Sequence, residues 1–246
     1  MIPLYVLTLD FKNAFERIAH GYLFQTLQGY GIGDPFITGI KRMYEGATSS
    51  VQINGHPYGP IPIRCAVHQG YPMSMALYAL CLHPFLRLLG LKLPGIRIGH
   101  RSRPTSVVVY ADDVTIFVTS ATDFTIIEEA IHLFKLVSGA RLNPRKSKAL
   151  AVGKWCTQDT FLGIAYHPSM TILGVTFWGT IKAMRETWAR LTGKVRTQVK
   201  RSYALGPCLE NWIRYVNTFL LSKIWYIAQI LLALNTYTQQ LTTATT

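Results

Sequence analysis

The sequence predicts an α+β domain followed by an all-α segment, with the boundary near residue 180. Short apolar runs of strand-forming residues occur at 4–9, 107–118 and 171–177, and stretches with helical periodicity separate them. From residue 182 onward the pattern is helical only. With 246 residues and 49% hydrophobic content, the chain is long enough to bury a proper core.

The first 91 residues are expected to form both strands and helices. Gly29 and Gly31 close the first helical pattern, and Asp34-Pro35 suits the cap and first position of the second. Asn54-Gly55 between alternating apolar residues is a hairpin signal. The expected elements are, in order, a strand at 4–9, helices at 14–28 and 36–45, a hairpin within 48–67 and a helix at 74–91.

Two adjacent carboxylates, Asp112 and Asp113, interrupt the apolar run at 107–118. The flanking β-branched and aromatic residues predict two short buried strands, with the pair at the bend between them. Burying either charge without a partner costs several kcal/mol at least, so we expect a cation beside them. The plain alternative is an ordinary Asp-Asp turn with exposed side chains.

The remaining pattern ends in a basic helical region. We expect a helix at 123–138, a basic loop and short strand from 139, and a strand at 171–177. The helix from Lys182 then has one apolar stripe, and a second, more apolar helix runs to about Leu234 before a frayed polar tail. The stripe consists of Met184, Trp188, Leu191, Val195 and Val199.

Positive charge is concentrated in the C-terminal part. Residues 1–138 hold 11 Lys and Arg against 9 Asp and Glu, whereas residues 139–246 hold 14 against 3, a net charge of +11. Such a segregated excess is typical of a region that binds a phosphate backbone, and a solvated basic face that keeps the protein soluble is equally compatible. The candidate nucleic-acid-binding residues lie off the apolar stripe: Lys182, Arg185, Arg190, Lys194, Arg196, Lys200 and Arg201.

Three carboxylates are expected to meet at one edge of the sheet. Asp10 ends one strand and Asp112 and Asp113 cap a hairpin, so a sheet that pairs these strands brings them together from about a hundred residues apart. Oxygen ligands suit Mg²⁺, and two such ions can stabilise both the attacking and the leaving oxygen of a phosphoryl transfer.

A series of five motifs gives the chain a family resemblance. LDFKNAFERI (9–18), HQGYPMS (68–74), YADD (110–113), GARLNPRKSKA (139–149) and ILGVTF (172–177) resemble, in order, the motifs of the reverse transcriptases of non-LTR (LINE-type) retrotransposons. YADD alone is a weak signal, whereas the ordered series is specific. The resemblance implies a polymerase palm with an antiparallel sheet and packed helices over 1–180, followed by a helical thumb-like segment over 181–246.

The resemblance also implies a role for each site residue. Asp10, Asp112 and Asp113, with the backbone carbonyl of Phe11, would hold two Mg²⁺ ions, for which Mn²⁺ would substitute. Phe15 would exclude a ribose 2′-hydroxyl by its bulk; its alternative is a core phenylalanine. Gln69 and Gly70 would line the nucleotide pocket. Lys146 would neutralise or protonate the leaving pyrophosphate, and a plain surface lysine is equally compatible.

The chain departs from the family pattern in several places. His68, Tyr71, Met75 and Glu16 replace residues that are usual in these motifs, although none of them removes a metal ligand. Only nine residues precede Asp10, so the basic fingers region that clamps the triphosphate is expected to be largely missing, as in an N-terminally truncated palm and thumb.

The function expected from these features is RNA-directed DNA synthesis. The partners would be an RNA template, a DNA primer and deoxynucleotides, with no membrane, because the apolar stretch 219–234 has only 16 residues and carries Lys223 and Gln229. The widely spaced cysteines and the lack of a signal-peptide pattern favour a nuclear or cytoplasmic location. The rival hypothesis is a catalytically inactive remnant that only binds nucleic acid through its basic C-terminal helix.

Overall fold

The computed structural model divides the chain into two compact units, Met1–Tyr166 and His167–Thr246. It describes residues 4–67, 72–97, 102–152, 160–178, 182–203 and 208–231. The division at residue 166 lies before the predicted boundary near residue 180. The names palm and thumb for the two parts remain a prediction.

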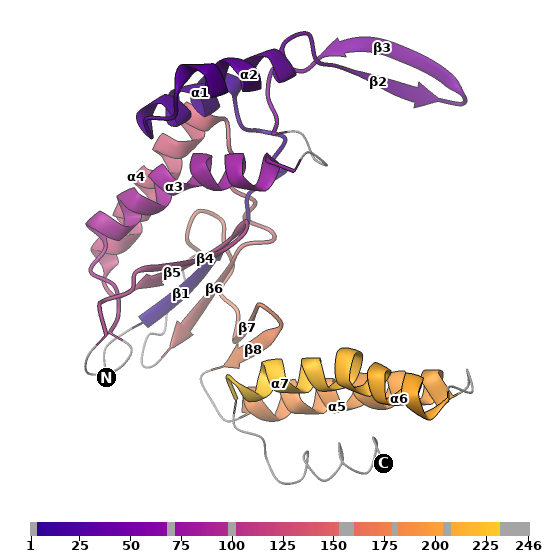
Figure 1. Cartoon of the computed structure of the whole chain (residues 1–246). Coiled ribbons are helices and arrows are strands. Elements are labelled where there is room, and N and C mark those ends of the chain that lie inside the picture. The colour runs from indigo at the N-terminus through magenta and orange to yellow at the C-terminus, as the bar shows by residue number, and fades with distance from the viewer. Residues whose placement is uncertain are drawn as a thin grey trace. The chain divides into compact units, whose positions relative to one another are not determined.

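A four-stranded antiparallel sheet with the order β4-β5-β1-β6 forms the centre of the first unit (Figure 1). Strand β1 (Leu4–Leu9) lies between β5 (Asp113–Val118) and β6 (Lys148–Val152), and β4 (Val107–Tyr110) forms one edge. Strand β1 is mostly buried, and its side chains Tyr5, Leu7 and Leu9 belong to the main core, which agrees with its largely apolar sequence.

Four helices supply most of the core: α1 (His20–Gly29), α2 (Asp34–Tyr44), α3 (Ser74–Lys92) and α4 (Ala121–Ser138). Helices α3 and α4 lie next to the sheet, α1 packs on α3 and α4, and α2 packs on α1 (Figure 1). The rings of Phe85 on α3 and Phe134 on α4 stack at 5.1 Å between centroids, and Phe11 meets both rings edge-on. This aromatic group joins the helical layer to the chain that leaves β1.

Helix α3 is the one helix in the described part of the chain that is long and apolar enough to cross a membrane. The core helix of a globular domain has the same length and composition. Seven residues of α3 are buried, including Leu82 and Phe85, so we assign it to the core of the first unit.

The first helix begins later than predicted, at His20 instead of Ala14. Residues 12–17 form turns, because the Lys12 N–H donates to the Arg141 carbonyl at 2.7 Å and Asn13 has a φ of 49°. The Asn13 side chain donates to Glu16 Oε2 at 2.8 Å and closes this turn locally. A long-range backbone bond therefore overrides the helical propensity of the segment.

Strands β2 (Thr48–Ile53) and β3 (His56–Pro62) form the predicted hairpin around Asn54-Gly55. Every residue of both strands is exposed, so this two-stranded ribbon buries no face of its own.

The second unit begins with a hairpin where a single strand was predicted. Strands β7 (Ser169–Ile172) and β8 (Val175–Trp178) are joined by Leu173 and Gly174, which have φ values of 47° and 82°. Two consecutive residues with positive φ are the signature of a tight two-residue hairpin turn. Val175 is buried in the helical core of this unit, which explains why the unit starts before residue 180.

Four helical segments follow in the described part of the second unit. Helix α5 (Lys182–Tyr203) is followed by α6 (Leu209–Tyr215), the π-helical segment η1 (Val216–Leu221) and α7 (Ser222–Ala228). The predicted second helix therefore contains a π-helical segment. Four residues of the predicted apolar stripe are buried as expected: Trp188, Leu191, Val195 and Val199. The side chain of Met184, the fifth, lies outside the described residues.

Candidate active site

The carboxylates of Asp10, Asp112 and Asp113 come to one end of the central sheet. Leu9 pairs with Val114 in the antiparallel ladder between β1 and β5, and continuing this register by one pair places Asp10 beside Asp113. Tyr110 pairs with Asp113, so Ala111 and Asp112 form the two-residue turn between β4 and β5. Ala111 has a φ of 56°, an uncommon conformation for a residue with a side chain, which such a turn requires.

The two adjacent carboxylates are exposed at the tip of this hairpin. The prediction of two short buried strands is correct for β5 but wrong for β4, whose residues are half-buried or exposed because it is the edge strand. The turn carries Asp112 and Asp113 beyond the buried part of β5. Their charges nevertheless interact. Partial burial, followed by the negative charges of Asp112 and Asp10, raises the pKa of Asp113 above its ordinary value.

No protein cation neutralises this group among the residues that the structure describes, where the two ion pairs are Lys92–Glu129 and Arg214–Glu210. Uncompensated carboxylates of this kind fit a divalent cation as a bound partner. Within the described ranges, however, no set of three or more His, Cys, Asp or Glu side chains is gathered closely enough to hold a metal ion. The side chains would have to close around an ion, and the exposed rotamers of Asp112 and Asp113 leave them room to do so.

Tyr78, which the sequence did not mark as a site residue, is buried next to the carboxylates. Its side chain is 2% exposed on α3, and burial, followed by the charges of Asp112, Cys81 and Asp10, raises its pKa. The phenol therefore stays protonated and can donate a hydrogen bond at the edge of the acidic group. Within the apolar run of α3 a tyrosine is typical of the core, so the sequence alone did not indicate that Tyr78 lies beside the carboxylates.

Phe15 lies on the ring of Tyr78, with centroids 4.4 Å apart and planes 29° apart. It is half-buried and packs against the main core, so the two expectations for this residue, core phenylalanine and sugar-contacting ring, are compatible. One side of the ring is fixed by Tyr78, and the exposed remainder is available to a ligand.

The loop that carries Lys146 is attached directly to Asp10. The Asn143 N–H donates to the Asp10 carbonyl at 2.8 Å, and the Asp10 N–H donates to the Ser147 hydroxyl at 3.0 Å. Ser147 is buried and Lys146 is exposed between these two anchors. Phe11 also pairs with Leu142, so this loop fixes the backbone of both residues that were predicted to supply metal ligands after β1. Asn143 and Ser147 thus position Asp10. Both residues belong to the motif at 139–149, but the sequence did not show that they contact Asp10.

The remaining predicted residues are either outside the described residues or among the basic residues of α5. Gln69 and Gly70 lie outside the described residues, as does the side chain of Lys182. Arg190 donates to the Gly174 carbonyl at 2.6 Å and so has a structural bond as well as a charge. Six basic residues of α5, Arg190 among them, are exposed and lie off its buried stripe: Arg185, Arg190, Lys194, Arg196, Lys200 and Arg201.

The sheet and its covering helices have a counterpart among solved structures. The fold is similar to that of telomerase from Candida tropicalis in complex with a TWJ fragment of telomeric RNA, with a TM-score of 0.55 and 13% identity over 78% of this chain and 34% of that one. Residues 3–177 match the model of the reverse transcriptase (RNA-dependent DNA polymerase) family. The chain therefore belongs to the reverse transcriptase family.

Its relatives include a transposon protein and the Pol polyprotein of a retrotransposable element. The chain is 29% identical over 231 residues to the "Transposon TX1 uncharacterized 149 kDa protein" of Xenopus laevis, covering 92% of this chain and 18% of that protein. It is 26% identical over 193 residues to the Pol polyprotein of the type-2 retrotransposable element R2DM of Drosophila melanogaster, covering 72% and 18%. The resemblance to non-LTR reverse transcriptases is thereby confirmed. The chain spans less than a fifth of the length of each of these two relatives.

Proposed function

We propose that this chain is an RNA-directed DNA polymerase domain of a non-LTR retrotransposon, which adds deoxynucleotides to the 3′-hydroxyl of a primer. The observation that carries the proposal is the meeting of Asp10 with the Asp112-Asp113 turn at one end of the sheet, within a chain of the reverse transcriptase family. An RNA template, a DNA primer and deoxynucleotides are the partners that this activity requires.

The acidic group is the proposed site for two Mg²⁺ ions, with Mn²⁺ as a substitute. Asp10, Asp112 and Asp113, with the Phe11 carbonyl, would hold them, and the bound ions would stabilise the charge on the attacking and leaving oxygens. The chain's own contribution is positioning. The bond that Asp10 accepts from the Asn143 N–H and the bond that it donates to the Ser147 hydroxyl fix its backbone. The same loop carries Lys146, whose ammonium group would neutralise the leaving pyrophosphate.

Nucleotide and nucleic-acid binding complete the proposal. Gln69 and Gly70 would line the nucleotide pocket, and Phe15 would limit the space at the sugar. The exposed basic residues of α5 would bind the phosphate backbone with little sequence preference and with strong salt dependence.

A primer-extension assay tests the proposed activity. The purified chain, with oligo(dT)-primed poly(rA), dTTP and Mg²⁺, is expected to incorporate labelled nucleotide into the primer. If no label is incorporated while the same primed template still binds in a gel-shift assay, the rival hypothesis of an inactive nucleic-acid-binding remnant is correct.

Shortening Phe15 to alanine is expected to weaken discrimination against ribonucleotides. Removing the ring opens space where a 2′-hydroxyl would otherwise collide, so the ratio of kcat/KM for dTTP over UTP should fall roughly 10- to 100-fold. Phe36→Ala, which removes an exposed ring on α2, is the matched control and should leave this ratio unchanged. An active Phe15→Ala variant with wild-type discrimination would show that Phe15 is only a core residue.

A further inference from the structure

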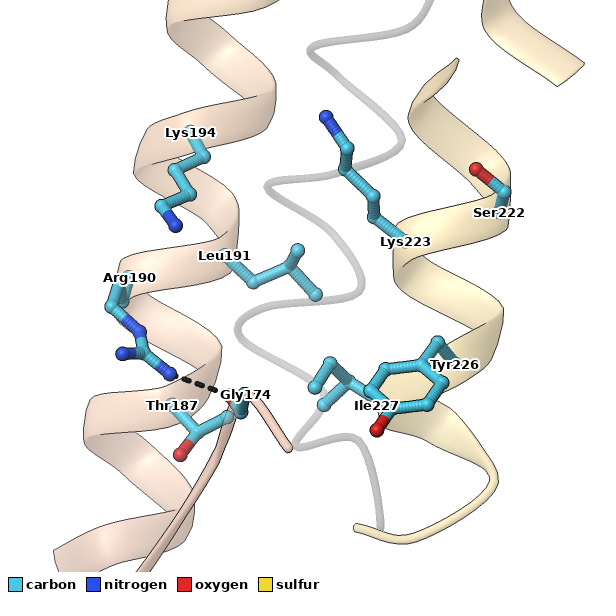
Figure 2. A pocket seen from close by; sticks show the side chains of 9 residues that line it. All are labelled: Gly174, Thr187, Arg190, Leu191, Lys194, Ser222, Lys223, Tyr226 and Ile227. Carbon is cyan, nitrogen blue, oxygen red and sulfur yellow. Dashed lines mark hydrogen bonds between the residues drawn. The ribbon is translucent and has the colours of Figure 1, made fainter. Parts of the chain in front are cut away.

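A cavity of about 320 Å³ lies in the second unit, between the turn of the β7–β8 hairpin, helix α5 and helix α7 (Figure 2). Arg190 and Lys194 come from adjacent turns of α5, and Lys223 extends from α7 toward α5. Leu191 and Ile227, which are both buried in the core of this unit, supply its apolar part. Three cationic side chains from two helices therefore surround one small cavity.

The positive charge of this cavity has little compensation. Over the described residues of the second unit, the acidic side chains are Glu186 and Glu210, and neither lines the cavity. Glu210 is already paired with Arg214 at 2.7 Å. Three cations line the cavity and no carboxylate does, so binding an anion there is favourable.

Bonds to neutral groups hold two of the three cations in place without cancelling their charge. The Arg190 guanidinium donates to the Gly174 carbonyl at 2.6 Å, and the Lys223 ammonium donates to Gln198 Oε1 at 3.0 Å. The Tyr226 hydroxyl donates to the Leu173 carbonyl at 2.7 Å, so the hairpin turn is tied to α5 and α7 together. A guanidinium has five N–H donors and an ammonium has three, which leaves donors free for a ligand.

We propose that this cavity, with Arg190, Lys194 and Lys223, binds a phosphate group of a nucleic-acid backbone and so acts as a fixed anchor point for the strand. The proposal rests on the proposed function. A tetrahedral oxyanion suits a guanidinium fork flanked by two ammonium groups. Lys200 and Arg201 continue the exposed basic row along the same helix, so a polyanion gains more from this surface than a single free phosphate does.

Binding of primed template to the full chain, measured by fluorescence anisotropy without deoxynucleotides or Mg²⁺, tests the site independently of catalysis. The variant Lys194→Gln/Lys223→Gln is expected to bind about 10-fold more weakly near 0.1 M salt, with the slope of log K against log salt reduced by roughly 1 to 2. Lys200→Gln/Arg201→Gln removes the same charge from α5 outside the cavity and is the matched control, with an expected smaller loss. Equal losses in the two variants would overturn the proposal, because net charge alone would then explain them.

Two further experiments test whether the variants are folded and whether the bound phosphate belongs to a nucleic-acid backbone. Lys194→Arg/Lys223→Arg keeps both charges and should retain binding within about 3-fold of the wild type, while thermal unfolding checks that each variant is folded. Competition with sodium tripolyphosphate distinguishes a free phosphate from a backbone phosphate. If tripolyphosphate binding depends on Lys194 and Lys223 while template binding does not, the cavity is a site for a free anion and the proposed anchor is wrong.

Discussion

Replacing Asp112 with asparagine is expected to lower primer extension by about 10³-fold or more. A carboxylate that holds catalytic cations contributes several kcal/mol to the transition state, and about 4 kcal/mol corresponds to this factor. Asparagine is nearly isosteric and suits a tight turn, so the β4–β5 hairpin should keep its shape. The rate of dTTP incorporation on primed poly(rA), compared at equal template saturation, measures the effect.

Two measurements separate a loss of catalysis from a loss of structure. Glu128→Gln makes the same chemical change at an exposed position of α4 and should remain fully active. The pKa of Asp113 should fall toward its ordinary value in Asp112→Asn, because one of the charges that raises it has been removed. Near-normal activity of Asp112→Asn would show that the paired carboxylates do not serve the reaction.

The meeting of Asp10 with the hairpin turn follows from features that a sequence contains. Each aspartate stands at the end of an apolar run, and the ladder between β1 and β5 brings strand ends together regardless of how far apart they lie in the chain. The β2–β3 hairpin was likewise predictable, because Asn54 and Gly55 both have positive φ values that a tight turn demands.

Other features depend on contacts between distant segments and were not predictable. The hydrogen bond from the Lys12 N–H to the Arg141 carbonyl favours turns over the predicted start of the helix. The sequence of residues 12–17 does not indicate this long-range bond. Leu173 is an unusual residue at a positive φ, so the β7–β8 turn looked like the middle of a strand. The position of Tyr78 under Phe15 needs the packing of α3 against the chain after β1, which only the folded structure reveals.

Asp123 should contribute more to the free energy of unfolding than an exposed carboxylate such as Asp34. Its side chain is 2% exposed at the start of α4 and accepts four hydrogen bonds. The Thr119 N–H and hydroxyl and the Ser120 N–H donate to Oδ2 at 2.8, 3.1 and 3.1 Å, and the Ser120 hydroxyl donates to Oδ1 at 2.7 Å. Asp123→Ala leaves these donors without their charged acceptor and is expected to cost about 2–4 kcal/mol of unfolding free energy.

The same bonds give this contribution a pH dependence with a defined sign. Burial alone would raise the pKa of Asp123, but the bonds from Ser120 and Thr119 outweigh it and lower the pKa below its ordinary value of 3.8. A carboxyl with a lowered folded pKa stabilises the protein above its unfolded pKa, and this stabilisation is lost as the pH falls through the folded value. The difference in unfolding free energy between wild type and Asp123→Ala should therefore be constant near neutral pH and shrink below about pH 4.

Urea unfolding followed by circular dichroism at several pH values measures this difference. Asp34→Ala, which removes an exposed aspartate from the first turn of α2, is the matched control. It should cost only about 0.3–1 kcal/mol, because a helix-dipole interaction at the surface is all that it loses. If Asp123→Ala were no more destabilising than Asp34→Ala, the four bonds would contribute little beyond what water supplies. The start of α4 would then depend on core packing by residues such as Ile127 and Phe134 instead of on its cap.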